Sequence, residues 1–278
     1  MTIAELLRQA QDRLTSAGSD EPQANSEWLL AHVLGVTRTW VLANGSFEIS
    51  EKDQTQFEKL LLRKEAGEPL SHIIGVQPFC GLDIVVTPDV LTPRPETEDL
   101  VEQVSKQFER EGAYTFLDMC TGSGCIAVAL AVKFPNARVL AVDISEAALK
   151  VAQQNIRKHK LEARVQLLQS NLWEEVNGSF DLIIANPPYI PTENLAALTR
   201  EVKHEPRLAL DGGADGYEIT RPLCQAADSF LAPRGLLALE LDDGQALPLV
   251  RGLEEIGWKA TVKKDIFNVE RFVFATHH

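Results

Sequence analysis

Strand-like and helix-like segments alternate along more than half of this chain, from residue 96 to residue 264. Such alternation is typical of a doubly wound, mostly parallel sheet in an α/β fold. We predict helices over residues 96–110, 125–134, 146–159, 222–230 and 246–256. We predict seven strands over residues 114–119, 137–143, 164–170, 180–186, 235–241, 259–265 and 271–277. Since only IFNVE joins the last two strands, the final strand is predicted to be antiparallel.

The first 75 residues carry helix signals and no strand signals. Thr2 and Glu5 form a capping-box pattern ahead of apolar residues at helical spacing, and Gly18 ends that segment. Further helices are predicted over 23–34, 37–43 and a segment capped by Ser50. We therefore predict a small helical bundle over 1–75, a β-hairpin or linker over 76–95, and an α/β domain over 96–278. A length of 278 residues suits more than one domain.

Charge and composition exclude several classes of protein. The net charge of −13 argues against direct binding of nucleic acid, because Lys and Arg contacts to phosphate supply most of that affinity. No apolar run approaches the roughly 18 residues of a membrane span, so we expect no membrane association. We expect no metal site, because the histidines are scattered. Reduced thiols and a cytoplasmic location are expected, because no C-x-x-C pair occurs among Cys80, Cys120, Cys125 and Cys224.

A glycine-containing loop follows the first strand of the α/β domain, directly after Asp118. Glycines between a strand and a helix let a ligand approach the backbone near the helix N-terminus. The alternative is a tight turn without a ligand. The dinucleotide fingerprint G-x-G-x-x-G is not met, which disfavours NAD. The predicted ligand-binding residues of this loop are Cys120, Thr121, Gly122, Ser123 and Gly124.

Polar residues also follow the next two strands. Asp143 is placed to accept hydrogen bonds from both ribose hydroxyls of a nucleoside, although it could instead cap the helix that starts near Glu146. Ser145 competes for that capping role. Asn171 is placed to meet an adenine edge while Leu172 packs on the ring, although Asn171 could be only a turn residue. These strand ends belong to the edge where open α/β sheets bind ligands.

The fourth strand runs into Asn186, Pro187, Pro188 and Tyr189. Two prolines cannot continue a central strand, because each lacks the N–H that the ladder requires. The chain therefore leaves the sheet in a rigid loop. This loop holds an amide side chain, a proline carbonyl and an aromatic ring at the edge of the sheet. The alternative is a rigid exit loop without chemistry.

These motifs together resemble the release-factor glutamine N5-methyltransferases of bacteria, a branch of the class I S-adenosylmethionine-dependent methyltransferases with an NPPY motif. The matching stretches are GEPLSHIIG, LTPRPETEDLVE, TGSGCIAVALA, NPPYIP and EPRLALDGGADG, between residues 67 and 216. Four residues depart from the family pattern. His204 stands where an aromatic ring is common, and Asp242 occupies a position often held by glycine. Cys120 replaces a common glycine, so we expect the backbone there to avoid a positive φ. Asn171 replaces a more usual acidic residue.

The resemblance implies a cytoplasmic enzyme that uses S-adenosylmethionine, yields S-adenosylhomocysteine and needs no metal. Its substrate would be the glutamine of the Gly-Gly-Gln motif in peptide chain release factors. A glutamine side-chain nitrogen is a poor nucleophile, so it has to be held and aimed at the methyl group. The Asn186 side-chain oxygen and the Pro187 carbonyl are expected to accept hydrogen bonds from its two N–H groups. Tyr189 is expected to stack on the amide beside Pro188. The N-terminal bundle is expected to dock the release factor.

Two other functions stay open at this point. The NPPY motif can also present an exocyclic amine of a DNA or RNA base, but the acidic balance and the lack of a basic recognition domain count against that function. A protein that binds S-adenosylmethionine without catalysis is the other alternative. The intact Asn186-Pro187-Pro188-Tyr189 motif argues against it.

Overall fold

The computed structural model describes residues 1–277 and divides them into two compact units, each of which is considered by itself. The helical unit comprises residues 1–76 together with residues 199–204. The sheet unit comprises residues 77–198 and the described chain from residue 205 onward. The chain therefore passes from one unit to the other after residues 76, 198 and 204.

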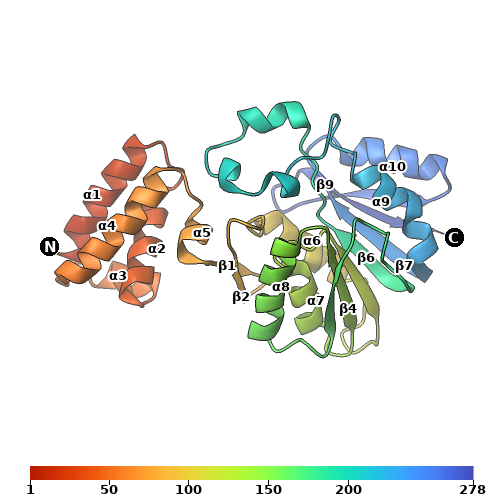
Figure 1. The fold of residues 1–278 in the computed structure, drawn as a ribbon, viewed down its shortest axis with the longest axis horizontal. Helices are drawn as coiled ribbons and strands as arrows, with labels where there is room; N and C mark the ends of the chain where they lie inside the picture. Colours follow the sequence, from red (N-terminus) through yellow and green to blue (C-terminus); the bar gives the residue numbers. More distant parts are fainter. Residues whose placement is uncertain (278) are drawn as a thin grey trace. The chain divides into compact units, whose positions relative to one another are not determined.

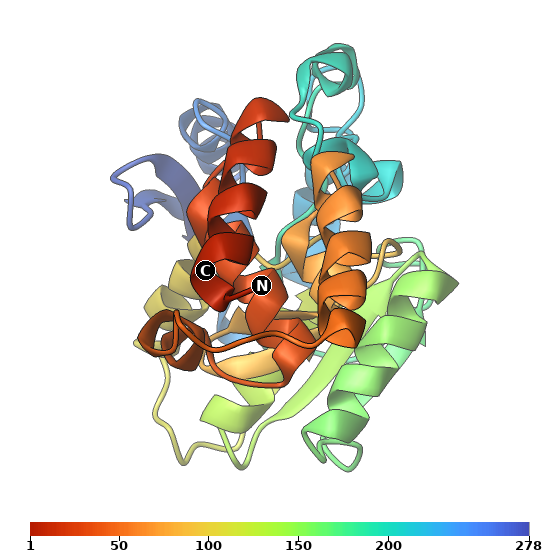
Figure 2. The same cartoon turned by 90° about the vertical axis from the view of Figure 1, so that its left-hand side faces the viewer.

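The helical unit is built from short helices around an apolar core. Figure 2 shows α1 in red and α4 in orange. Thr2 and Glu5 form the predicted capping box, and Gly35 ends the second helix in the left-handed conformation. The predicted bundle is confirmed, while the short α5 was not predicted. The helices are α1 Ile3–Ser16, α2 Pro22–Leu34, α3 Arg38–Ala43, α4 Glu51–Glu65 and α5 Leu70–Ile74.

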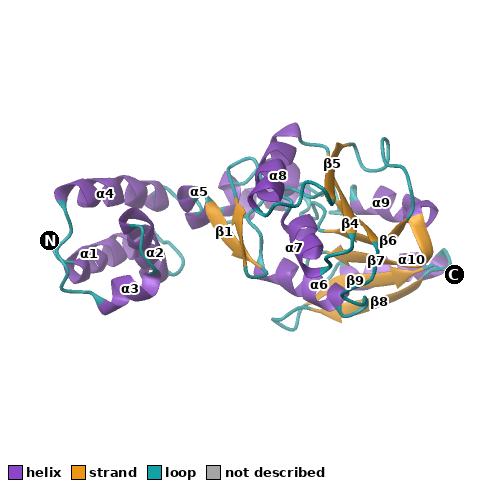
Figure 3. Ribbon diagram, turned by 90° about the horizontal axis from the view of Figure 1, so that it is seen from below, coloured by secondary structure: helices purple, strands orange, loops and turns teal. Residues whose placement is uncertain are grey.

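The sheet unit contains a seven-stranded sheet in the order β5-β4-β3-β6-β7-β9-β8 (Figure 3). All neighbouring strands from β5 to β7 are parallel, whereas β9 is antiparallel to β7 and β8. The predicted fold class is therefore confirmed. The strands are β3 Thr115–Met119, β4 Arg138–Asp143, β5 Val165–Gln169, β6 Phe180–Ala185, β7 Leu231–Glu240, β8 Lys259–Lys264 and β9 Glu270–Thr276. A separate two-stranded sheet pairs β1 Val76–Phe79 with β2 Leu82–Val85.

Helices cover both faces of the seven-stranded sheet (Figure 1). Successive strand residues point to opposite faces, so Phe116 packs in the core beneath α6, α7 and α8, while Leu117 packs in the core beneath α9 and α10. These helices are α6 Pro95–Ser105, α7 Cys125–Lys133, α8 Glu146–Lys158, α9 Thr220–Ala227 and α10 Ala246–Glu255. None of the helices within residues 1–277 has the length and apolar character needed to cross a membrane.

The strand order creates one point where the direction of winding reverses. From β3 the chain proceeds to β4 and β5 on one side, and then returns to place β6 on the other side of β3. The carboxyl ends of these strands meet at one edge of the sheet, where doubly wound folds bind their ligands. Irregular chain beyond β6 includes short 3₁₀ turns that were not predicted, η1 Thr192–Ala197, η2 Val202–His204 and η3 Arg207–Ala209.

Candidate active site

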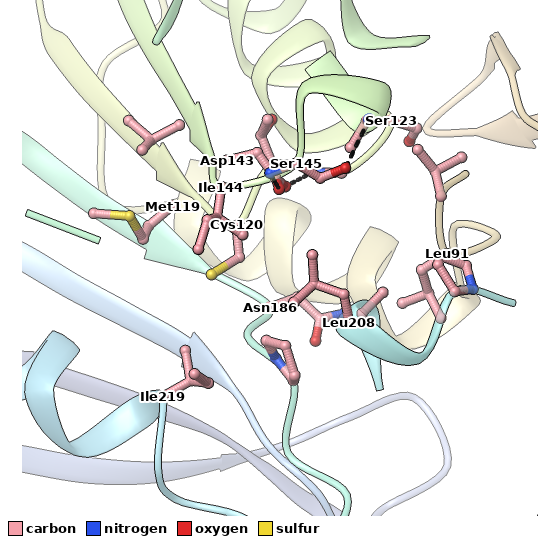
Figure 4. Close-up of a pocket in the computed structure, with 18 of the residues that line it drawn as sticks. Leu91, Met119, Cys120, Ser123, Asp143, Ile144, Ser145, Asn186, Leu208 and Ile219 are labelled. Carbon is pink, nitrogen blue, oxygen red and sulfur yellow. Dashed lines mark hydrogen bonds between the residues drawn. The ribbon is translucent and has the colours of Figure 1, made fainter. Parts of the chain in front are cut away.

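A cavity opens within the sheet unit at the carboxyl ends of β3, β4, β5 and β6. Figure 4 shows Asp143 and Ser145 on one side of it and Asn186 and Leu208 on another. The cavity is lined by nine of the residues predicted from the sequence, Cys120, Thr121, Gly122, Ser123, Asp143, Asn171, Leu172, Asn186 and Pro188. Gly124, Pro187 and Tyr189 were also predicted, and they do not line it.

Asp118 anchors the loop that follows β3. Its side chain is fully buried, and its Oδ2 atom accepts hydrogen bonds from the Thr121 hydroxyl at 2.5 Å and the Ala127 N–H at 3.0 Å. Burial raises the pKa of this carboxyl to about 7. Since Asp118 does not line the cavity, it acts by holding the loop against the start of α7.

The backbone at Cys120 contradicts the expectation drawn from the sequence. Its φ is +61°, in the left-handed region that the replacement of glycine was expected to avoid. A left-handed residue costs about 1–2 kcal/mol for any side chain with a Cβ. The loop imposes this conformation, because the Thr121 N–H must donate to the Val142 carbonyl at 2.9 Å while the chain turns away from the sheet. The Cys120 side chain consequently lines the cavity.

The two glycines of the loop have different roles. Gly122 has φ +54°, and a Cβ placed there would meet no atom within 4 Å, so a ligand can approach its backbone. Gly124 has φ +77° and begins α7, and a Cβ there would lie 3.0 Å from the Ala152 Cβ. Gly124 therefore permits close packing of α7 on α8, which agrees with its position outside the cavity lining.

Asp143 holds the glycine loop and faces the cavity. Its Oδ2 atom accepts from the Gly122 N–H at 2.8 Å, and its Oδ1 atom accepts from the Ser145 N–H at 2.9 Å. Burial raises the pKa of the carboxyl, and these backbone hydrogen bonds oppose that shift. Ser145, rather than Asp143, caps α8, because its hydroxyl accepts from the Ala148 N–H. A carboxylate oxygen has more than one lone pair, so capacity remains for ligand hydroxyls.

Asn171 and Leu172 line the cavity beyond β5. The Asn171 side-chain amide donates to the Glu174 carboxylate at 2.8 Å, which stabilises a local turn. Leu172 has φ +49°, and its carbonyl accepts from the Ser170 hydroxyl at 2.9 Å. Both sequence interpretations of Asn171 are therefore compatible with its position, because it stabilises a turn at the wall of the cavity.

The carboxamide of Asn186 is held by hydrogen bonds at its nitrogen. The Nδ2 atom donates to Glu240 Oε1 at 2.9 Å and to Thr97 Oγ1 at 3.1 Å. Within residues 1–277, no hydrogen-bond donor reaches its Oδ1 atom or the Pro187 carbonyl oxygen. Both oxygens thus keep their lone pairs for a ligand.

Tyr189 is partly buried and is not among the residues that line the cavity. Its carbonyl accepts from the Gln245 side-chain amide at 2.9 Å. Burial raises the pKa of its hydroxyl, and the nearby carboxylates of Glu240 and Asp242 add to that shift. Because the ring does not line the cavity, contact with a ligand amide is a proposal that rests on the motif.

Thr97 and Glu240 were not predicted as functional residues. Each is 2% exposed, and burial raises the pKa of the Glu240 carboxyl to about 7. The sequence contains a signal for Glu240, since an apolar strand that ends in a carboxylate at the ligand-binding edge is unusual. Thr97 lies in the first turn of α6, within the matching stretch LTPRPETEDLVE, but its residue type alone does not indicate a role in the site.

Two loops that line the cavity are joined by Glu205. This residue is 5% exposed, and its carboxylate accepts from the Thr92 N–H at 3.0 Å and from the Arg94 guanidinium at 2.7 Å. Leu91 and Leu208 belong to the two loops and line the cavity. These loops were also not predicted to line it, because they are remote in sequence from the strand ends.

Among residues 1–277, no group of three or more His, Cys, Asp or Glu is arranged to hold a metal ion.

Two different protein families match two separate parts of the chain. Residues 5–75 match the family described as PrmC N-terminal domain, and residues 96–249 match the family described as methyltransferase small domain. The chain is 45% identical over 250 residues to the release factor glutamine methyltransferase of Moorella thermoacetica, covering 89% of this chain and 88% of that protein. It is 38% identical over 275 residues to the one of Deinococcus radiodurans, covering 99% and 98%.

Solved structures with lower identity support the fold alone. A ribosomal protein L11 methylase from Lactobacillus delbrueckii has a TM-score of 0.52 at 22% identity, covering 68% of this chain and 82% of that chain. A 16S rRNA N2 G1207 methyltransferase from T. thermophilus, solved with AdoMet and guanosine, has a TM-score of 0.54 at 22% identity, covering 73% and 50%.

Proposed function

Because the chain belongs to the release factor glutamine methyltransferase family, we propose that it methylates the side-chain amide nitrogen (N5) of the glutamine in the Gly-Gly-Gln motif of peptide chain release factors. The methyl donor is proposed to be S-adenosylmethionine, and the reaction is proposed to take place in the cytoplasm. The observation that carries this proposal is the orientation of Asn186, whose nitrogen is occupied by Glu240 and Thr97 while its oxygen stays available.

The chemistry of the residues that line the cavity supports S-adenosylmethionine as its ligand. Gly122 leaves open space above its backbone, and the Asp143 carboxylate lies beside it. Asp143 would accept from the ribose hydroxyls, and Asn171 and Leu172 would lie against the adenine. When bound, S-adenosylmethionine supplies a methyl group on a positively charged sulfur. Cys120, Thr121 and Ser123 would complete the wall around it.

The proposed role of Asn186 follows from the chemistry of an amide. The lone pair of a glutamine side-chain nitrogen is delocalised into its carbonyl, which makes that nitrogen a weak nucleophile. Asn186 Oδ1 and the Pro187 carbonyl oxygen would accept its two N–H bonds and hold the nitrogen in place. As the nitrogen gains positive character, both hydrogen bonds strengthen, so they stabilise the transition state more than the bound substrate. Tyr189 would pack against the plane of the amide.

The helical unit is proposed to dock the release factor. One glutamine offers few atoms, so selection of one protein requires a second contact patch, and a typical specific interface buries about 1,600 Å². Large apolar side chains are exposed on this unit, and such side chains are common at the centre of interfaces. They include Trp28 at 42%, Leu42 at 55%, Phe47 at 49% and Leu62 at 53% exposure.

Mass spectrometry tests the proposed reaction directly. The full chain is incubated with S-adenosylmethionine and a purified release factor, and the glutamine of Gly-Gly-Gln is expected to gain one methyl group. The Asn186→Ala variant is expected to bind S-adenosylmethionine within about tenfold of the original affinity but to transfer methyl at least about 100-fold more slowly. An unmodified glutamine with the original chain, or equal losses of binding and transfer in the variant, would contradict the proposal.

A further inference from the structure

A carboxamide side chain can present either its oxygen or its NH₂ group to a substrate, and the proposed reaction needs the oxygen. We propose that Thr97 and Glu240 are positioning residues that hold the Asn186 carboxamide with its oxygen toward the substrate amide. This inference rests on the proposed function, in which Asn186 Oδ1 accepts a substrate N–H. It assigns a role to two buried residues on separate elements of the sheet unit.

The hydrogen-bond geometry accounts for both protons of the Asn186 nitrogen. One is directed to Glu240 Oε1 at 2.9 Å and the other to Thr97 Oγ1 at 3.1 Å. The Thr97 hydroxyl also lowers the pKa of the Glu240 carboxyl. Thr97 Oγ1 and Glu240 Oε1 both act as acceptors toward Asn186. Asn186, Thr97 and Glu240 therefore form a triangle of side chains in which the Asn186 nitrogen donates to both of its neighbours.

Reversal of the Asn186 carboxamide would break this arrangement. Its oxygen would then face Glu240 Oε1 and Thr97 Oγ1, two atoms that act as acceptors in the triangle. The hydrogen bond to the ionised Glu240 carboxylate would be replaced by a contact between lone pairs in a buried place, where such a contact is especially unfavourable. The reversed NH₂ group would also present donors to the N–H bonds of the substrate. The reversed side chain would thus lose its hydrogen bond to Glu240 and could not accept hydrogen bonds from the substrate.

The fold makes the triangle rigid. Asn186 directly follows β6, and Glu240 ends the neighbouring strand β7, with Ala185 paired to Leu239. Thr97 lies in the first turn of α6. Glu96 and Arg271 are the other charged groups that act on Glu240, with Glu96 raising its pKa and Arg271 lowering it. A strand, a helix and a rigid proline loop therefore supply one corner each.

Burial of the Glu240 carboxylate lowers the stability of the fold, so a purely structural role does not explain this residue. It is 2% exposed, and no donor within residues 1–277 reaches its Oε2 atom. A buried carboxylate with an unpaired oxygen costs stability, and well-packed apolar side chains often replace such groups without loss. A requirement for an acceptor opposite Asn186 Nδ2 explains why a carboxylate occupies this position.

The test compares Thr97→Val, which removes the hydroxyl at nearly constant volume, with the matched control Thr97→Ser, which keeps it. Methyl transfer is followed in single turnovers at saturating S-adenosylmethionine, and cofactor affinity is measured by calorimetry. We expect Thr97→Val to slow transfer by at least about tenfold with cofactor affinity within about threefold, and Thr97→Ser to stay within about threefold of the original rate. A slow Thr97→Ser variant, or an unaffected Thr97→Val variant, would overturn the inference.

A double-mutant cycle separates positioning from a general structural effect. If Thr97 acts through Asn186, then Thr97→Val should change the transfer rate less than about twofold in the Asn186→Ala background. Rate losses that multiply would overturn the inference. Glu240→Gln and Glu240→Leu provide an independent pair, because glutamine keeps an acceptor oxygen and leucine does not, so the leucine variant should be the slower one. Equal rates for this pair would also count against the inference.

The cycle also distinguishes this inference from the proposed function. If Asn186→Ala alone leaves methyl transfer unchanged, the proposed role of Asn186 fails, and the positioning role fails with it. If Asn186→Ala slows transfer but Thr97→Val does not, only the positioning role fails.

Discussion

Lys64 and Glu201 form an ion pair within the helical unit, although 137 positions separate them in the sequence. The side chain of Lys64 is 1% exposed and that of Glu201 is 33% exposed. The neighbouring Arg200 donates to the Ala66 carbonyl at 2.9 Å, where α4 ends. The helical unit thus binds a segment of the chain that follows the NPPY motif in sequence.

The first prediction concerns the stability that this ion pair supplies. Glu201→Gln removes the negative charge opposite the buried Lys64 ammonium and leaves it with two neutral acceptors, the new amide oxygen and the Glu68 carbonyl at 3.3 Å. We expect the free energy of unfolding of the helical unit to fall by about 1–3 kcal/mol, as measured by urea denaturation. The matched control is Glu102→Gln, whose partner Lys133 has a side chain that is 39% exposed, and it should cost less than about 1 kcal/mol. Equal losses would contradict the prediction.

Local signals and long-range contacts differ in how well the sequence predicts them. Ser50 caps α4 as predicted, because its hydroxyl meets the Asp53 N–H only three residues away. Lys64 resembles an ordinary surface lysine in the last turn of the same helix. Its burial depends on Glu201, and no pattern within either segment indicates that the two meet.

The second prediction concerns the proposed docking role of the helical unit. Leu42→Ser and Phe47→Ser remove exposed apolar side chains from this unit. If the release factor docks there, these variants should raise KM for the intact release factor by at least about fivefold while KM for a short Gly-Gly-Gln peptide stays within about twofold. Equal changes on protein and peptide, or none on either, would contradict docking on these side chains.

A chain shortened to begin near Val76 gives a less direct test of docking. We expect it to bind S-adenosylmethionine and to lose most activity on intact release factor. Residues 199–204 would lose their partners in the same chain, because Lys64 and Ala66 would be removed. Some loss on the peptide is therefore expected as well, and point variants of the full chain separate the two effects.

The third prediction concerns Asp143 and the cofactor. Asp143→Ala should weaken binding of S-adenosylmethionine by about 1.5–3 kcal/mol, the scale of a charge-assisted hydrogen bond, as measured by calorimetry. Asp143 also holds the N–H groups of Gly122 and Ser145, so part of this loss reflects a loosened loop. Asp143→Asn keeps one acceptor and should lose less. Unchanged affinity in Asp143→Ala would remove this residue from the proposed site, and NAD should not compete at comparable concentration.

The sequence predicted the site residues at the strand ends better than the residues proposed to position them. Asp143 and Asn186 follow strands whose alternation with helices fixes the edge at which they lie. Thr97 and Glu240 act on Asn186 through tertiary contacts. The matching stretch around Thr97 and the carboxylate at the end of β7 do not by themselves indicate those contacts. The sequence also misjudged Cys120, because the demand for φ +61° comes from the hydrogen bonds of the loop rather than from the residue type.

The fourth prediction concerns Asp118 and the dependence of stability on pH. Burial raises the pKa of its carboxyl from 3.8 to about 7, the nearby Asp143 adds to this shift, and hydrogen bonds from Thr121 and Ala127 oppose it. Between about pH 4 and pH 7, the folded chain therefore keeps a proton that the unfolded chain releases. Stability falls with rising pH wherever the folded state binds more protons, by at most about 1.4 kcal/mol per pH unit for one group.

Asp118→Asn should remove this contribution, because an asparagine cannot ionise and resembles the protonated acid in shape. Relative to the original chain, the variant should gain stability as the pH rises from 5 to 8, as measured by urea denaturation at both values. Glu240, whose pKa is also raised to about 7, keeps its own contribution in both chains and cancels from the comparison. A constant difference between the two chains across this range would show that Asp118 is already ionised in the fold at pH 5.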